Sequence, residues 1–126
     1  YEAKINNKKY INLWGTGRPK REIIYVDDLA EAIIFFLKKK IKHNLINIGT
    51  SKEYSIKEIA NRIIKILNLD IKIKFNNNSK YDGIQSKILD TNVASKYGWT
   101  PKIKFEEAII KTYQDLVKNY KKIKSI

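Results

Sequence analysis

The chain has 126 residues, of which 43% are hydrophobic, and a formal net charge of +13 at pH 7. This length predicts one domain with its own core and leaves no room for two. No apolar run approaches the roughly 18 residues of a membrane span, so we expect no membrane partner. The lack of cysteine excludes disulfides and a thiolate nucleophile, and the one histidine, His43, is interpreted as a solvated surface residue rather than a metal ligand. Because Tyr1 is not methionine and begins no signal peptide, we expect a piece of a longer chain.

The net charge raises the hypothesis of a nucleic-acid partner. However, 23 of the 26 basic residues are Lys and only 3 are Arg. Nucleic-acid binders favour Arg, whose planar group binds phosphate bidentately, beside aromatic rings for stacking. The lysines are spread along the chain, with one run at 38–42. We therefore interpret the charge as a solvated surface and expect no specific nucleic-acid binding.

Two strands and a tight turn are expected near the start of the chain. Residues 10–14 alternate in the manner of a strand and stop at Gly15-Thr16-Gly17, which reads as a turn. Residues 21–26 form a β-branched and aromatic run that predicts a second strand.

A helix should follow this second strand. We expect Asp27 and Asp28 to cap the helix rather than to act as an acid/base pair, because carboxylates are good caps. Asp28 and Glu31 have the spacing of a capping box. Apolar residues then recur at helical spacing from Leu29 to Leu37.

The middle of the chain predicts a strand, a helix and a strand. Residues 45–48 are apolar and stop at a glycine, which is typical of a buried parallel strand. Residues 55–58 form a capping box that opens a helix, and residues 71–75 alternate strictly, as in a strand with one solvated face. The expected apolar face of the helix consists of Ile56, Ile59, Ala60, Ile63, Ile64 and Leu67.

The last part of the chain should be mainly helical. Residues 76–85 predict a loop, and residues 89–97 a short helix that ends at Gly98. A final amphipathic helix has Glu106-Glu107 in its first turn, and residues 121–126 should fray. Strands that alternate with helices indicate the α/β class, and the strands needed to cover the sheet edges are expected upstream of Tyr1.

The residues best suited to bind a ligand lie in the turn after the first strand. Trp14 offers an aromatic face and Arg21 a group that takes phosphate or carboxylate bidentately. The turn is neither a P-loop nor a Rossmann glycine motif. Taken alone, the pattern also fits a Trp14 buried in the core and an Arg21 in a surface ion pair.

Five motifs provide a more specific context. They are Trp14-Gly15-Thr16-Gly17-x-Pro19-x-Arg21-Glu22-x-x-Tyr25-Val26-Asp27-Asp28-Leu29-Ala30, Ile46-Asn47-Ile48-Gly49-Thr50, Ser55-Ile56-Lys57-Glu58-Ile59-Ala60, Asp82-Gly83-x-x-x-Lys87-x-Leu89-Asp90 and Gly98-Trp99-x-Pro101. In order and spacing they resemble the C-terminal part of the GDP-L-fucose synthases, which are extended short-chain dehydrogenases. The resemblance covers nearly the whole chain. It implies the end of a Rossmann-like parallel sheet plus the smaller substrate-binding α/β domain, with residues 1–126 as one nucleotide-sugar-binding part.

The resemblance also implies an activity and a site. The family uses NADPH to convert GDP-4-keto-6-deoxy-D-mannose to GDP-L-fucose by 3,5-epimerisation and 4-reduction, and we expect a cytoplasmic homodimer. Its catalytic and cofactor-binding residues lie upstream, so none is expected here. The positions that match its GDP-sugar site are Trp14 on the sugar, Asp82 as an acceptor, and Arg21 and Lys87 on the diphosphate.

Two departures and two alternatives accompany this resemblance. Ile84-Gln85-Ser86 stands where the family often has Thr-Pro-Arg, which predicts weaker nucleotide binding, and Lys104 is an unfavourable cap for the final helix. Another nucleotide-sugar epimerase or dehydratase of the same superfamily would share the strand–helix motif. A small basic nucleic-acid-binding domain is the alternative from a different class.

Overall fold

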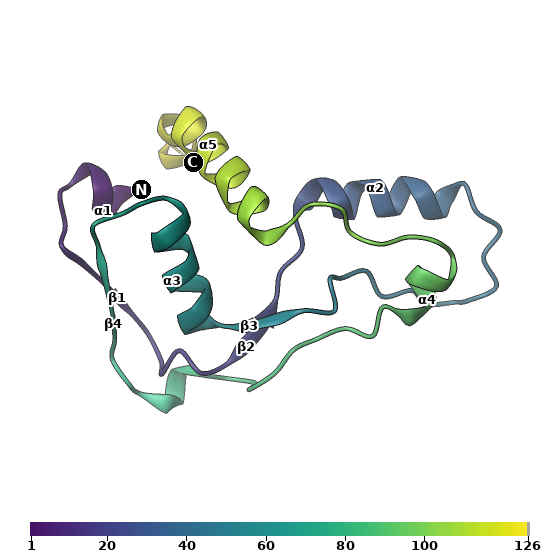
Figure 1. Cartoon of the computed structure of the whole chain (residues 1–126), viewed down its shortest axis with the longest axis horizontal. Coiled ribbons are helices and arrows are strands. Elements are labelled where there is room, and N and C mark those ends of the chain that lie inside the picture. The colour runs from purple at the N-terminus through teal and green to yellow at the C-terminus, as the bar shows by residue number, and fades with distance from the viewer. Residues whose placement is uncertain (126) are drawn as a thin grey trace.

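The computed structural model describes residues 1–125 and shows an elongated molecule (Figure 1). Helices α2 and α4 lie at one end, and α1, β1, β4 and α3 lie at the other, with β2 and β3 between them. The elements in chain order are α1 Glu2–Ile5, β1 Tyr10–Leu13, β2 Lys20–Glu22, α2 Val26–Leu37, β3 Glu53–Ser55, α3 Ile56–Ile66, β4 Lys72–Phe75, the 3-10 turn η1 Ser79–Tyr81, α4 Asn92–Lys96 and α5 Phe105–Lys124.

The strands form two separate pairs. β1 and β4 are parallel, with Tyr10 opposite Lys72 and Leu13 opposite Phe75. β2 and β3 are antiparallel, with Glu22 opposite Glu53. A parallel pair needs a long crossover, and here the crossover contains β2, α2, β3 and α3. The α/β class and the strands predicted near residues 10–14 and 71–75 are confirmed.

Helix α3 begins where its capping box predicts. The Glu58 backbone N–H donates to the Ser55 hydroxyl at 3.1 Å, and the Ser55 backbone N–H donates to the Glu58 carboxylate at 2.7 Å. The helix is joined to α5 through Arg62, whose guanidinium lies 4.4 Å from the Tyr54 ring centroid and 4.5 Å from that of Phe105. The capping prediction is therefore correct, and its helix links β3 to α5.

Helix α2 starts earlier than expected and has no side-chain cap. It begins at Val26, so the strand predicted over residues 21–26 ends at Glu22. Asp28 is 4% exposed, and its carboxylate accepts the backbone N–H groups of Lys102 and Ile103 at 3.2 and 2.9 Å. The prediction that Asp27 and Asp28 cap the helix is wrong because Asp28 serves the segment before α5 instead.

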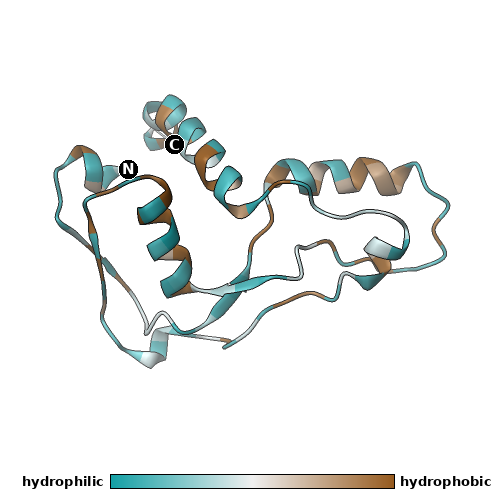
Figure 2. Cartoon of the chain, viewed as in Figure 1, coloured by the Kyte–Doolittle hydropathy of each residue, from teal (hydrophilic) through white to brown (hydrophobic). Residues whose placement is uncertain are grey.

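Residues 45–48 are not a strand in this structure. A strand requires a hydrogen-bonded neighbour, and within the part that the structure describes no backbone group of residues 45–48 has one. This segment and α2 also expose much apolar surface, including 76% of Leu45 and 77% of Leu37. Figure 2 shows hydrophobic residues along α2, at the thin end of the molecule.

The core is small and lies beside α2. Ala32, Ala94 and Trp99 are its buried residues, and Phe36 and Ile48 are among the half-buried side chains that pack on them. No large side chain is completely buried among residues 1–125. The sequence predicts a domain with its own core, and in the described residues that core consists of this small cluster.

Both helices predicted for the C-terminal part are present, but α4 differs from its predicted length. α4 is shorter than predicted, but Gly98 has a φ of +88°, which suits the position after a helix end. α5 begins after Lys104, which makes no side-chain capping bond, and it is helical to Lys124, so the fraying expected for residues 121–126 stays a prediction. Residue 126 lies outside the described residues. Among the described helices, none is both long and apolar enough to cross a membrane.

Candidate nucleotide-sugar site

The turn after β1 is held in shape by side chains from the loop after β4. Gly15 and Gly17 have φ values of +78° and +74°, in the left-handed region that favours glycine. The backbone N–H and the hydroxyl of Thr16 each donate to Asp82 at 2.7 Å. The backbone N–H of Gly15 donates to Asn76 Oδ1 at 2.9 Å. Two regions far apart in the sequence therefore build one rigid turn.

Asp82 is charged in this arrangement. The hydrogen bonds from the Thr16 backbone and hydroxyl lower the pKa of Asp82 below its ordinary value, and Arg18 lowers the pKa further by its charge. Both oxygens of Asp82 already accept from Thr16, but an ionised carboxylate has about four acceptor sites in all. Asp82 thus shapes the turn and keeps lone pairs for a ligand.

Trp14 lies at the surface rather than in the core. Its side chain is 79% exposed, so the alternative of a core tryptophan is wrong. Its ring lies 5.9 Å from that of Tyr81, at an interplanar angle of 35°, and Tyr81 is itself 57% exposed. The two rings form an open aromatic surface on the turn.

Arg21 reaches across to the loop that contains Asp82. Its Nη1 donates to the carbonyl of Ile84 at 2.8 Å and to that of Lys20 at 2.6 Å. Within residues 1–125 Arg21 forms no ion pair, so the surface ion-pair alternative is not observed, and its Nε and Nη2 make no hydrogen bond. These two groups can therefore bind one anion bidentately.

Lys87 lies on the extended segment 84–91, which continues from this loop along β2. The backbone N–H of Lys20 donates to the Gln85 carbonyl at 2.7 Å, which brings the segment beside the strand that contains Arg21. Lys87 is exposed, and across the described chain it makes no ion pair or hydrogen bond. Trp14 contacts Tyr81, Asp82 bonds to Thr16 and Arg21 bonds to the Ile84 carbonyl, so these three residues are linked through neighbours rather than in direct contact, and Lys87 lies further along the segment that follows Asp82.

Two glutamates that the sequence analysis did not single out hold segment 84–91. Glu22 accepts the Leu89 backbone N–H at 2.8 Å, and Glu53 accepts the Ser86 hydroxyl at 2.6 Å. Glu22 stands next to Arg21 in the first motif, but nothing in the spacing of the motifs showed that its partner is 67 positions away.

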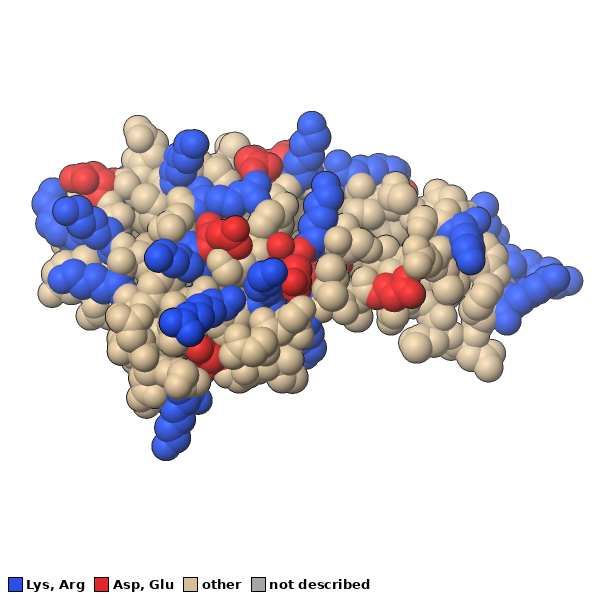
Figure 3. Space-filling model, turned by 60° about the horizontal axis from the view of Figure 1, so that its bottom comes forward, with Lys and Arg blue, Asp and Glu red and all other residues tan. Residues whose placement is uncertain are grey.

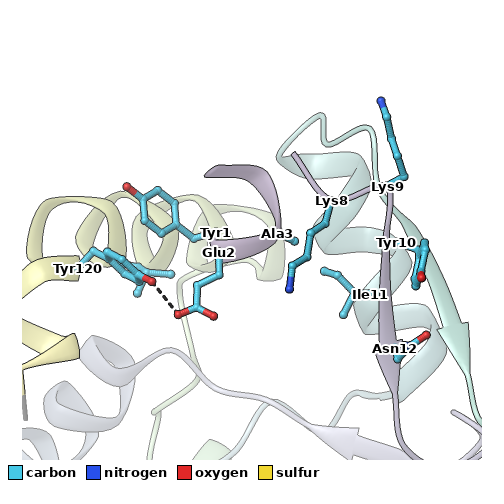
Figure 4. Close-up of a pocket in the computed structure, with 10 residues that line it drawn as sticks. Tyr1, Glu2, Ala3, Lys8, Lys9, Tyr10, Ile11, Asn12 and Tyr120 are labelled. Atoms are coloured by element: carbon cyan, nitrogen blue, oxygen red, sulfur yellow. Dashed lines mark hydrogen bonds between the residues drawn. The ribbon is translucent and has the colours of Figure 1, made fainter. Parts of the chain in front are cut away.

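The remaining candidates lie apart from this group. His43 is exposed and its Nδ1 lies 3.1 Å from the Tyr97 hydroxyl, as expected for a surface histidine. No cluster of potential metal ligands occurs in the described residues. A cavity of about 900 Å³ lies between α1, β1 and α5, and its lining residues include Glu2 and Tyr120, which are joined by a hydrogen bond of 2.7 Å (Figure 4). None of the four predicted site residues lines it.

The described residues do not fit the pyrophosphate of a dinucleotide. A β-carbon added to Gly17 would lie 2.7 Å from the Phe75 ring, and one on Gly15 would meet Asp82, so the protein's own side chains fill the space that these glycines leave. The turn leads into β2, whereas a dinucleotide turn leads into a helix N-terminus. This turn therefore provides no site for the pyrophosphate of NADPH.

Comparisons with known proteins find similar sequences and similar structures. Residues 2–49 match the NAD dependent epimerase/dehydratase family. The chain is 34% identical to GDP-L-fucose synthase 1 of Arabidopsis thaliana over 119 residues, which cover 94% of this chain and 36% of the relative. A GDP-6-OMe-4-keto-L-xylo-heptose reductase from Campylobacter jejuni has a similar structure, with a TM-score of 0.75, 30% identity and coverage of 94% of this chain and 38% of that one. A GDP-D-glycero-L-gluco-heptose synthase from the same organism, crystallised in the presence of NADPH, has a TM-score of 0.72 and 32% identity, over 85% of this chain and 33% of that one.

In sequence and in fold the chain is therefore similar to enzymes of the NAD dependent epimerase/dehydratase type. Among them it is similar to the GDP-L-fucose synthases and to GDP-heptose enzymes. It spans a little over a third of the length of the curated relatives that it matches.

Proposed function

We propose that this chain is the C-terminal, nucleotide-sugar-binding part of an NADPH-dependent GDP-sugar epimerase and reductase of the GDP-L-fucose synthase type. Two contacts support the proposal: Thr16 bonds to Asp82, which joins the turn after Trp14 to the Asp82 loop, and Arg21 on β2 donates to the Ile84 carbonyl, which joins that strand to the same region. Four residues that match the family's GDP-sugar site thereby come from two regions that the fold brings together.

Each residue has a chemical role in this proposal. Arg21 binds the diphosphate through its free Nε and Nη2, and Lys87 adds a second cation. Trp14 lies against the sugar, and Asp82 accepts hydrogen bonds from the ligand while it holds the turn. Hydrogen bonds between charged partners contribute roughly 1.5–3 kcal/mol each, which is enough for these two cations to dominate binding.

The complete enzyme supplies the rest. In this proposal NADPH and the catalytic residues belong to an N-terminal Rossmann part, which also provides the strand neighbours that residues 45–48 lack. The complete enzyme is a cytoplasmic homodimer and converts GDP-4-keto-6-deoxy-D-mannose to GDP-L-fucose by 3,5-epimerisation and 4-reduction.

A titration of GDP tests the site in the complete enzyme. Arg21→Ala and Lys87→Ala should each weaken GDP binding about 10- to 100-fold, the loss expected for one charge-assisted contact. Lys39→Ala, an exposed lysine at the far end of the molecule, is the matched control and should bind as the parent does. NADPH binding checks that each variant is folded. Equal GDP affinity in all three variants would contradict the site.

A second candidate function of the same class differs in the sugar of the substrate. Similarity to two GDP-heptose enzymes favours a GDP-heptose reductase as the alternative. Turnover of GDP-4-keto-6-deoxy-D-mannose against GDP-4-keto-heptoses, measured by NADPH oxidation, separates the two. Preference for UDP over GDP in the titration would instead support another epimerase or dehydratase of the superfamily.

A further inference from the structure

Glu22 and Glu53 face each other across the β2–β3 pair. Like charges at directly opposed positions destabilise a sheet, so other contacts of these two carboxylates must offset their repulsion. Glu53 has a cation partner, Lys20, at 3.4 Å. Glu22 has no ion-pair partner in the described part of the chain, and its oxygens accept backbone N–H groups instead.

The Glu22 carboxylate joins two separate loops. One oxygen accepts the backbone N–H groups of Thr50 and Ser51, the latter at 2.6 Å, and the other accepts that of Leu89 at 2.8 Å. A β-carbon on Gly49 would clash with this carboxylate, so the glycine allows the loop to approach closely. Three backbone donors on one carboxylate make Glu22 a fixed junction.

Segment 84–91 has no helix or strand of its own, yet it is anchored at most positions. Its anchors are the Ile84 carbonyl to Arg21, the Gln85 carbonyl to Lys20, the Ser86 hydroxyl to Glu53, the Leu89 N–H to Glu22, the Asp90 carbonyl to Asn47 and the Thr91 hydroxyl to Ser51. Only Lys87 and Ile88 lack an anchor, and each is directly flanked by a residue that a glutamate holds. The backbone of Lys87 therefore lies between Ser86 and Leu89, which are both held by hydrogen bonds to glutamates.

We propose that Glu22 and Glu53 are positioning residues, which hold segment 84–91 against β2 so that Lys87 is placed for the diphosphate of the nucleotide sugar. The inference rests on the proposed function, because it assigns the glutamates an effect through Lys87. A lysine is a flexible point charge, so the position of its backbone decides where the charge can act. Arg21 lies on the same strand as Glu22, which fixes the separation of the two cations.

The test is a double-mutant cycle on GDP affinity in the complete enzyme. In Glu22→Gln only one oxygen is left to accept, so the bond to Leu89 or the bonds to the 50–51 loop are lost. We expect GDP affinity to fall about 10-fold. In a Lys87→Ala background the same substitution should cause no further loss, because residues that act through one contact are not additive. A merely structural role for Glu22 gives additive losses, and that result would overturn the inference.

Two further variants keep the test independent of folding. Ser86→Ala removes the hydroxyl that donates to Glu53, so it breaks this bond without changing Glu53 itself. It should lower GDP affinity in the parent but not in the Lys87→Ala background. Glu31→Gln, a surface glutamate on α2 that pairs with Lys102 at 2.7 Å, is the matched control and should change nothing. Amide exchange should accelerate in segment 84–91 in Glu22→Gln, and unchanged exchange there also overturns the inference. Failure of the parent itself to bind GDP would instead overturn the proposed function.

Discussion

Thr16 and Asp82 are joined by two hydrogen bonds of 2.7 Å, although 66 positions separate them in the chain. Through this pair the loop after β4 sets the conformation of the turn after β1. Along the chain, Trp14 directly precedes that turn and Arg21 follows it on β2. The Asp82 carboxylate thus holds the turn that lies between Trp14 and Arg21 in the chain.

This pair predicts a pH-dependent stability. Because its hydrogen bonds lower the pKa of Asp82 in the folded chain, they stabilise the fold above the ordinary aspartate pKa of about 3.9, and this contribution is lost as pH falls through the lower, folded pKa. Asp82→Asn should therefore be less stable than the parent at pH 7, and the difference should disappear in strong acid. Urea midpoints of both proteins across this range provide the measurement. A difference that stays constant with pH would refute the assignment.

The two tryptophans predict a fluorescence signature for ligand binding. Trp14 is 79% exposed beside the proposed sugar site, whereas Trp99 is 3% exposed in the core. Addition of a GDP-sugar to the complete enzyme should shift or quench the emission of Trp14, because the ligand changes the surroundings of this exposed ring but not those of Trp99. Trp14→Phe should lower the amplitude of the response and Trp99→Phe should leave it unchanged. An amplitude that is the same in Trp14→Phe as in the parent would remove this residue from the site.

The Ser55 cap predicts a measurable loss of stability. Ser55→Ala removes the hydroxyl that accepts the Glu58 N–H and should cost about 1 kcal/mol of unfolding free energy. Ser95→Ala is a suitable control, because that hydroxyl donates to the carbonyls of Thr91 and Asn92 at the start of α4 and caps no backbone N–H. Chemical unfolding of both variants decides the matter, and equal effects would mean that the cap contributes nothing.

The distribution of charge predicts weak, salt-sensitive binding to nucleic acid. Figure 3 shows Lys and Arg scattered over the visible face rather than gathered in one patch. Dispersed lysines contribute through counterion release alone, so affinity should fall steeply with salt and show no sequence preference. Filter binding of two unrelated duplexes at rising salt tests this. Selective binding that persists at about 200 mM salt would favour the nucleic-acid alternative.

Local patterns predicted those parts of the fold that local forces determine. The Ser55 box and the alternation at residues 71–75 involve neighbours in sequence, and both are confirmed. Residues 45–48 have the composition of a strand, but composition supplies no hydrogen-bond partner. Asp28 has the type and place of a cap, yet a tertiary contact with Lys102 and Ile103 uses its carboxylate instead.

The same distinction applies to the candidate site. Trp14, Arg21, Asp82 and Lys87 were indicated by family motifs, and the fold brings the regions that contain them together. Glu22 was missed because its role lies in backbone bonds to distant loops, which leave no trace in residue spacing.

The parallel pairing of β1 with β4 has a consequence for the order of folding. β2, α2, β3 and α3 all lie between the two strands in the chain, so their ends meet only after a large loss of loop entropy. Helix α3, with its own cap, depends on local contacts and can form early. The Gly15 N–H bonds to Asn76 directly beyond this strand pair, so we expect the turn to form late in folding. A chain that is partly unfolded at this pair should keep its helices but lose the turn on which the proposed site depends.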